Sequence, residues 1–200
     1  MTSIVTTTIP GWRNFSSIQS EARKPIVAAG HSLGEYSALV AAGAIDFADA
    51  VRLVHKRGQY MQSAVAVGQG AMLAVLGQEV TELENLLASY KNLQIANINA
   101  PGQIVISGSA EDAHNFQTKH AGMKMIPLSV SAPFHCRLMQ PAQDALSLDL
   151  DKITIKQPSF PVIANYLAQP LSDPESIRQA LKDQVTGRVR WVESMEKAIN

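Results

Sequence analysis

The sequence predicts an α/β fold that carries a small α+β insertion, and two patterns support this. An apolar run at 25–29 stops at a glycine and is followed by helical periodicity, as in a buried strand that leads into a helix. Between 70 and 128, strand and helix patterns alternate in the order βαββαβ, which is the order of a ferredoxin-like unit. We expect an unmatched segment at 1–24, an α/β body at 25–67 and 130–200, and a ferredoxin-like subdomain at 68–129.

Helix boundaries in the body are indicated by capping residues. Gly43 suits the position just past a helix C-terminus, Asp46 suits an N-cap, and Pro174 suits a first helical position. The predicted helices are 33–42, 47–61, 137–150, 174–184 and 189–199, and the predicted strands are 25–29 and 160–164.

The insertion alternates more regularly than the body. A Pro-Gly pair at 101–102 marks a turn between two strand patterns. The predicted strands are 71–76, 93–98, 103–107 and 123–128, and the predicted helices are 80–90 and 111–120.

The composition is that of an ordinary globular protein and excludes several classes of partner. Lys and Arg number 17, as do Asp and Glu, so the formal net charge is zero. This balance argues against binding to nucleic acid or to an anionic membrane surface. The longest apolar stretch, 38–45, is too short to span a bilayer, and 1–20 lacks the pattern of a secretory signal. With one cysteine, Cys136, no internal disulfide can form, and we expect a cytoplasmic protein.

Metal and nucleotide sites are not predicted. Cysteine and histidine never cluster at the spacings that metal sites use. The Gly-Gln-Gly run at 68–70 has neither the third glycine nor the preceding strand of a dinucleotide-binding loop. We therefore expect no metal and no bound cofactor.

The strongest chemical signal is the motif G-H-S-L-G at 30–34, between a predicted strand and a predicted helix. It fits the G-x-S-x-G nucleophile elbow, in which a sharp turn exposes the serine hydroxyl. Ser32 would then lie at a helix N-terminus, where developing negative charge is favoured, and the backbone N–H of Leu33 is a natural oxyanion donor. The alternative is a glycine-rich turn with no chemistry.

A serine nucleophile needs a base, and five histidines are available. His31 adjoins the serine and is expected to point elsewhere, while His55, His114 and His120 fall on polar helix positions. His135 follows a strand and lies in a loop, which is where catalytic groups gather on a rigid scaffold. His135 is therefore the best-placed base, with a purely structural histidine as the alternative.

Arg57 shares a helical stripe with apolar residues, which are Phe47, Ala50, Val54 and Met61. A guanidinium that points inward is costly unless it meets an anion, and its planar fork suits a carboxylate. One interpretation is that this anion belongs to a substrate. The alternatives are a structural ion pair, or a stem that packs while the head reaches water.

Separated motifs in one order make the interpretation more specific. They are G-H-S-L-G-E-Y-S-A at 30–38, R-G at 57–58, N-I-N-A-P-G-Q at 97–103, and A-P-F-H-C at 132–136 with L-M at 138–139. Together they resemble the malonyl-CoA:acyl-carrier-protein transacylase family, whose signature also occurs in the acyltransferase domains of fatty-acid and polyketide synthases. The resemblance runs from about residue 25 to nearly the C-terminus.

The resemblance implies a fold and a ping-pong mechanism. Malonyl would pass from malonyl-CoA to Ser32, and then to the phosphopantetheine thiol of acyl carrier protein. His135 would be the base, and Arg57 would pair with the free malonyl carboxylate. The fold implied is an α/β-hydrolase-like acyltransferase body with a ferredoxin-like insertion. The further residues expected at the substrate site are Leu33, His31 and Phe134, the last resembling the malonyl-selective form.

Two family features are unmatched. Nothing at 1–24 matches the first strand and the Gly-Gln-Gly-Ser-Gln-type loop that gives a second oxyanion N–H. The segment that orients the histidine through a backbone carbonyl and an amide side chain is expected beyond Asn200. We therefore expect a chain that is truncated at both ends. Two alternatives stay open, a serine hydrolase such as a thioesterase and an inactive fragment that only binds.

Overall fold

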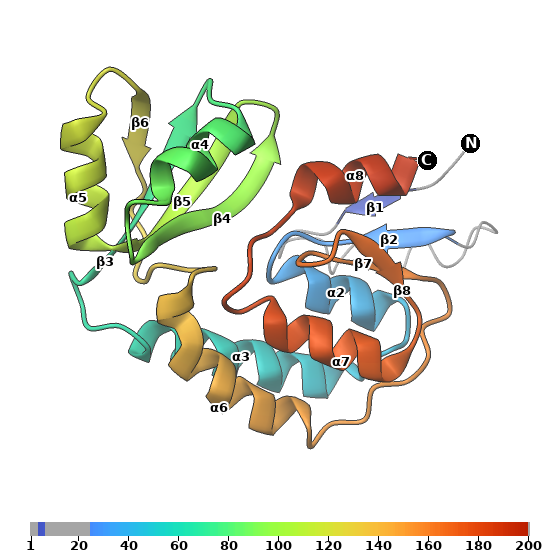
Figure 1. Cartoon of the computed structure of the whole chain (residues 1–200). Coiled ribbons are helices and arrows are strands. Elements are labelled where there is room, and N and C mark those ends of the chain that lie inside the picture. Colours follow the sequence, from blue (N-terminus) through green and yellow to red (C-terminus); the bar gives the residue numbers. More distant parts are fainter. Residues whose placement is uncertain (1–3, 7–24, 200) are drawn as a thin grey trace.

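The computed structural model describes residues 4–6 and 25–199, which form two sheets with helices packed on each (Figure 1). The body sheet has the order β1-β2-β7-β8, in which β1, β2 and β7 run parallel and β8 is antiparallel to β7. Its strands are β1 (Ile4–Thr6), β2 (Val27–Ala29), β7 (Val162–Ala164) and β8 (Gln169–Leu171).

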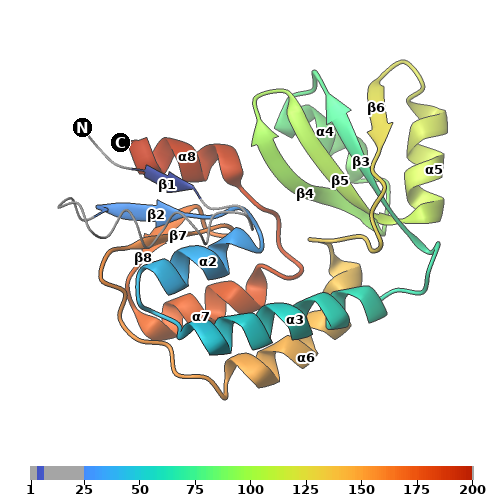
Figure 2. The same ribbon diagram turned by 180° about the vertical axis from the view of Figure 1, so that it is seen from behind.

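Helices cover both faces of the body sheet. Helix α8 lies against one face, while α2 and α7 lie against the other, and α3 and α6 pack side by side beyond them (Figures 1 and 2). Met139 lies in η2, a short 3₁₀ turn at Arg137–Met139 that leads into α6. The helices are α2 (Gly34–Ala41), α3 (Phe47–Ser63), α6 (Gln140–Leu150), α7 (Pro174–Asp183) and α8 (Trp191–Ile199).

The small sheet is antiparallel throughout and has the order β4-β5-β3-β6. Helices α4 (Val80–Leu87) and α5 (Ala110–Lys119) pack on it through Leu83 and Phe116, which share one core with Ile104 and Ile106. Its strands are β3 (Gly70–Leu76), β4 (Leu93–Ala100), β5 (Gln103–Ser109) and β6 (Lys124–Pro127).

Capping signals in the sequence explain several helix ends. The Asp46 carboxylate accepts a hydrogen bond from the Ala48 N–H at 2.9 Å, and the Asp173 carboxylate accepts one from the Ser176 N–H at 2.8 Å. Gly43 has a φ of 74°, the left-handed conformation that glycine adopts without strain. These caps confirm the predicted starts of α3 and α7 and the predicted end of α2.

The predicted elements of residues 25–199 occur, with small shifts at their ends. One helix, α4, stops at Leu87 rather than at residue 90. Strand β8 was not predicted, because three residues that include Pro170 show too short a pattern, and proline is tolerated there only at a sheet edge. The expectation of an unmatched segment at 1–24 falls mostly outside the described residues. The described part of this segment is β1, which was not predicted and which pairs in parallel with β2.

The two sheets are joined by backbone contacts as well as by the chain crossovers. The Ile98 N–H of β4 donates to the Val189 carbonyl at 2.9 Å, and the Val189 N–H donates to the Ala96 carbonyl at 2.7 Å. The segment between α7 and α8 therefore runs beside β4. Among the described residues, no helix has both the length and the apolar character needed to cross a membrane.

Candidate active site

Ser32 lies at the corner between β2 and α2, in strained backbone. Its φ is 52°, in the left-handed region that non-glycine residues rarely adopt. The corner is tight enough that a Cβ at Gly30 would lie 2.0 Å from the Gly34 carbonyl oxygen. The Ser32 N–H donates to the Asn165 Oδ1 at 2.5 Å, so the residue after β7 helps to hold the turn. The serine is thus presented at the N-terminus of α2, as an elbow requires.

His135 is the hydrogen-bond partner of the serine. The Ser32 Oγ lies 2.7 Å from the His135 Nε2, and the Nδ1 of the same ring lies 2.9 Å from the Gln184 carbonyl oxygen. Because a carbonyl only accepts, Nδ1 carries the proton, and Nε2 is free to accept the serine proton. Burial, together with the Arg57 charge, lowers the pKa of His135 to about 3, so the ring is a neutral base at ordinary pH.

Arg57 reaches the same point from α3. Its side chain is buried, and Nη2 donates to the Ser32 Oγ and to the Gln184 Oε1, each at 3.1 Å. The guanidinium carbon lies 5.9 Å from the centre of the Tyr36 ring. Its Nε is buried without an acceptor in the described part of the chain, and burial lowers the pKa of Arg57. A buried cation with an unused donor beside a serine hydroxyl suits an anionic group.

The other predicted site residues lie around this centre. The His31 Nε2 donates a hydrogen bond to the Asn99 Oδ1 at 2.9 Å, and the ring makes an edge contact with the Trp191 ring. Leu33 caps α2 and lines an apolar cavity of about 280 Å³ between α2 and α3. Phe134 is half-buried against the cores of both sheets.

The remaining three histidines lie on α3 and on α5 or at its end, and the cysteine directly follows His135 in the chain. His55 and His114 are exposed, and His120 packs on the Phe116 ring. Cys136 is buried, and its thiol donates to the Pro133 carbonyl at 3.0 Å. No group of metal-ligating side chains occurs among residues 4–6 and 25–199.

Comparison with known proteins agrees with this geometry. Residues 14–199 match the acyl transferase domain family. The chain belongs to this family. Malonyl CoA-acyl carrier protein transacylase of Bacillus subtilis is 46% identical over 182 residues, 88% of this chain and 57% of that protein. The protein of the same name from Escherichia coli K12 is 45% identical over 184 residues, 89% of this chain and 60% of that protein.

Solved structures show the same acyl transferase architecture. The malonyl CoA-acyl carrier protein transacylase of Coxiella burnetii superposes with a TM-score of 0.86 at 45% identity, covering 92% of this chain and 60% of that one. A type II PKS acyl-carrier protein in complex with its malonyl-transacylase also matches, with a TM-score of 0.85 at 42% identity over 92% of this chain and 61% of that one. The chain thus spans about three fifths of the length of these relatives.

The structure corrects one expectation about this acyl transferase domain. The carbonyl that orients the histidine was expected beyond Asn200, but it belongs to Gln184, which directly follows α7. Its backbone carbonyl accepts from His135, and its side chain contacts Arg57 and donates to the Ser32 carbonyl at 3.0 Å. The sequence held a signal for this, because Gln184 shares the buried stripe of α7 with Ile177 and Leu181, the pattern that drew attention to Arg57.

Two further buried polar residues of the acyl transferase site were not predicted. Asn165 is fully buried, and its Nδ2 donates to the Gly30 carbonyl at 2.8 Å. Glu35 is also buried and accepts hydrogen bonds from the Asn165 backbone and the Gln184 amide. Nothing local marked Asn165, because its role depends on the end of β7 lying beside β2.

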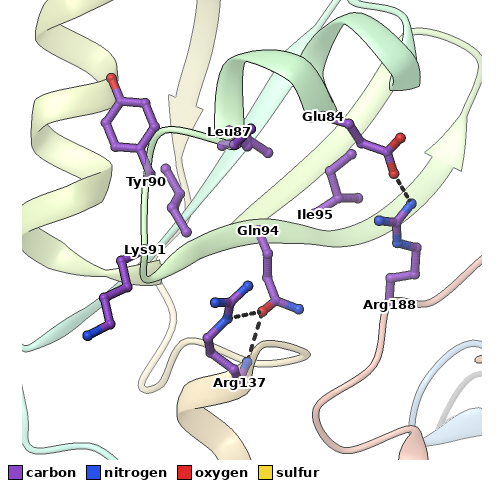
Figure 3. Close-up of a pocket in the computed structure, with 10 residues that line it drawn as sticks. Glu84, Leu87, Tyr90, Lys91, Gln94, Ile95, Arg137 and Arg188 are labelled. Atoms are coloured by element: carbon purple, nitrogen blue, oxygen red, sulfur yellow. Dashed lines mark hydrogen bonds and ion pairs between the residues drawn. The ribbon is translucent and has the colours of Figure 1, made fainter.

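Outside this centre, the acyl transferase domain has a surface pocket of about 310 Å³ where α4 and β4 meet the body (Figure 3). The Gln94 Oε1 accepts from the backbone N–H and the Nε of Arg137, both at 3.1 Å, and Arg188 pairs with Glu84 at 2.7 Å. Arg137 lies two positions after His135, and Arg188 lies four positions after Gln184. The pocket walls therefore connect the small sheet to the two segments that build the site.

Proposed function

We propose that this chain carries the catalytic centre of a malonyl-CoA:acyl-carrier-protein transacylase, with Ser32 as the nucleophile, in fatty-acid biosynthesis. The observation that carries the proposal is the contact of a buried arginine with the hydroxyl of an elbow serine that also faces a neutral histidine. The names of the relatives support malonyl-CoA and acyl carrier protein as the two substrates.

In the first half-reaction, the Ser32 Oγ attacks the thioester carbonyl of malonyl-CoA while the His135 Nε2 takes the hydroxyl proton. The oxyanion that forms lies at the N-terminus of α2, where the Leu33 N–H is a donor. Collapse of the tetrahedral intermediate breaks the C–S bond, and His135 returns the proton to the coenzyme A thiolate. The product is a malonyl ester on Ser32.

In the second half-reaction, the roles of the leaving and attacking groups are reversed. The phosphopantetheine thiol of the carrier protein gives its proton to the His135 Nε2, and its sulfur attacks the ester carbonyl. The C–O bond to Ser32 then breaks, and His135 returns the proton to the serine oxygen. Transfer to water at this step would make the chain a hydrolase, which is the alternative outcome of the test below.

Arg57 supplies the acyl specificity in this proposal. The malonyl carboxylate is a stronger acceptor for the guanidinium than the neutral oxygens of Ser32 and Gln184, and it also accepts from the Nε, which has no acceptor in the described residues. An acetyl group would leave that buried cation unpaired, a penalty of roughly 1–3 kcal/mol or more. We assign His31 and Phe134 to the walls of the acyl site, which their positions beside Ser32 and His135 in the chain support.

We also propose the domain division. The antiparallel order β4-β5-β3-β6, with α4 and α5 in one core, supports a ferredoxin-like subdomain at 68–129. It interrupts an α/β-hydrolase-like body at 25–67 and 130–200, where the parallel strands and the elbow support that assignment. The buried, free thiol of Cys136 agrees with a cytoplasmic location.

The test is the mass of the chain after incubation with malonyl-CoA. We expect a malonyl adduct on wild type, which a carrier protein with its phosphopantetheine arm then removes, and no adduct on Ser32→Ala. Ser89→Ala, which removes an exposed serine of the small subdomain, is the matched control and keeps the adduct. Arg57→Ala is expected to lose preference for malonyl-CoA over acetyl-CoA.

Three outcomes would count against the proposal. Equal labelling of wild type and Ser32→Ala would exclude Ser32 as the nucleophile. An adduct lost to water at the same rate with and without carrier protein would indicate a hydrolase. The absence of any adduct on folded wild type would indicate a fragment that only binds.

A further inference from the structure

We propose that Glu35 is a positioning residue of the acyl transfer site, whose carboxylate orients the Gln184 amide and, through it, Arg57 and His135. The inference rests on the proposed function. Glu35 lies in the first turn of α2, only 2% exposed, and its own N–H donates to the Ser32 carbonyl at 3.1 Å. It touches no reacting atom, so its effect has to pass through its neighbours.

One oxygen of Glu35 joins the two residues that hold the site. The Oε2 accepts from the Asn165 backbone N–H at 3.0 Å and from the Gln184 Nε2 at 2.7 Å. Asn165 holds the elbow through its side chain, and Gln184 holds the base through its backbone carbonyl. The carboxylate therefore ties the end of β7 to the end of α7, directly behind the nucleophile.

The direction of the Gln184 amide depends on this carboxylate. Arg57 only donates hydrogen bonds, so the Gln184 Oε1 has to face it, as it does at 3.1 Å. The Nε2 then faces two acceptors, the Ser32 carbonyl and Glu35. A reversed amide would set donor against donor at Arg57. An ionised carboxylate accepts only, and so it opposes that reversal.

The charges around Glu35 agree with a role in the site. No cation of the described residues lies within ion-pair distance of it, and a buried carboxylate without such a partner destabilises a fold. Arg57, whose charge acts on Glu35, lies across the Gln184 amide, which points its oxygen at the cation and its NH₂ at the anion. The need to position the Gln184 amide explains why a carboxylate is buried here despite the cost in stability.

Glu35 also titrates in a range where its neighbours do not. Burial raises the pKa of Glu35 to about 7, although the hydrogen bonds from Asn165 and Gln184 and the Arg57 charge oppose this. Burial raises the pKa of Tyr36 to about 12 and lowers that of His135 to about 3, so both are neutral near pH 7. Arg57 stays charged. Above pH 7 the ionised Glu35 holds the amide, and protonation below pH 7 weakens that hold.

The experiment measures the single-turnover rate of Ser32 malonylation by malonyl-CoA as a function of pH, on the whole chain. In wild type we expect the rate to fall as the pH falls through about 7. In Glu35→Gln we expect a rate roughly tenfold to hundredfold lower on the alkaline side, since a charged hydrogen-bond partner is lost, and no fall near pH 7. Glu82→Gln, in the first turn of α4 and exposed, is the matched control and keeps the wild-type rate and profile.

A double-mutant cycle isolates the route through the amide. Gln184→Met keeps the backbone carbonyl but removes the amide, so it should lose both rate and the fall near pH 7, and adding Glu35→Gln should cost little more. Should Glu35→Gln fail to fold, the wild-type and Gln184→Met profiles decide alone.

The possible results separate the two proposals. Suppose that wild type is malonylated, but Glu35→Gln keeps the wild-type rate and pH profile, or the losses in the double variant are additive. Either result would overturn this inference and leave the proposed function intact. Folded wild type without a malonyl ester would overturn both.

Discussion

The two sheets of this molecule are specified in different ways. The small sheet has antiparallel strands of four to eight residues, with register shifts only between β4 and β5 among the described strands, and its helices close on it within 58 positions of the chain, from Gly70 to Pro127. The body sheet has strands of three residues, and its site is joined by side-chain contacts between distant segments. Ser32 and His135 are 103 positions apart, and His135 and Gln184 are 49 apart. Local pattern determines the first region, and long-range polar contacts determine the second.

This difference predicts that the regions can be damaged separately. The small sheet is stabilised by an apolar core in which Leu83 and Phe116 are fully buried. The body has its own core, with Leu146 and Leu150 fully buried, and the polar network lies above it. A variant in the small core should therefore lower stability more than it lowers the chemistry of the folded molecule.

The largest effect is expected for Phe116→Ala. The Phe116 ring contacts the rings of Tyr90 and His120, with centroid distances of 5.3 and 4.6 Å. Its loss should cost about 3–5 kcal/mol of unfolding free energy, measured by denaturant titration. The malonylation rate per folded molecule should change little, because Ser32, His135, Arg57 and Gln184 are not among the described residues of this core.

Leu146→Ala in the body is the matched comparison, with an expected loss of about 2–5 kcal/mol. If Phe116→Ala slowed malonylation of the folded fraction as much as Gln184→Met does, the small sheet would be part of the positioning network, and the separation of the two regions would be wrong.

The second effect concerns the stability of the body at acid pH. His135 has an ordinary pKa of 6.5 when unfolded and about 3 when folded, so the unfolded chain binds the proton first. The stability that the neutral ring contributes is complete above pH 6.5 and is lost as the pH falls toward about 3, by roughly 1 kcal/mol for each pH unit. Glu35 acts in the opposite sense, because its raised pKa makes the fold gain stability as the pH falls from about 7 to 4.5.

The His135 contribution is isolated by comparing wild type with His135→Gln over the same pH range. The variant should lose less unfolding free energy on acidification, and His114→Gln, which changes an exposed histidine, should follow wild type. Parallel pH curves for wild type and His135→Gln would contradict the low pKa and hence the assignment of a neutral base.

The contrast between local pattern and long-range contacts also decides which features could be predicted from the sequence. Alternation and turn signals predicted every strand of the small sheet, because each strand is long enough to show its period. The structure also brings together Ser32, His135 and Arg57. These three residues were predicted because each left a local signal in the sequence: a motif, a loop position and an arginine on an apolar helix stripe.

The residues that escaped prediction are those that function through distant contacts. Asn165 and Glu35 matter because β7 ends beside β2, and spacing along the chain does not reveal that. Gln184 could have been predicted, because it is a polar side chain on the buried stripe of α7, just as Arg57 is a charged side chain on the apolar stripe of α3. Inward polar residues on apolar helix faces are therefore the signal to follow in such sequences.

The smallest effect is expected where the two regions meet at the surface. Arg188→Ala removes the 2.7 Å ion pair with Glu84. The Arg188 side chain is 33% exposed and the Glu84 side chain is 42% exposed. An exposed pair of this kind contributes at most about 1 kcal/mol and is screened by salt. The backbone hydrogen bonds between β4 and Val189 stay in place and continue to fix the junction. Thermal unfolding should shift by a few degrees at low salt and less at high salt, with malonylation unchanged. A salt-independent loss of malonylation would mean that this pair, rather than the backbone contacts, aligns the small sheet with the residues that hold the base.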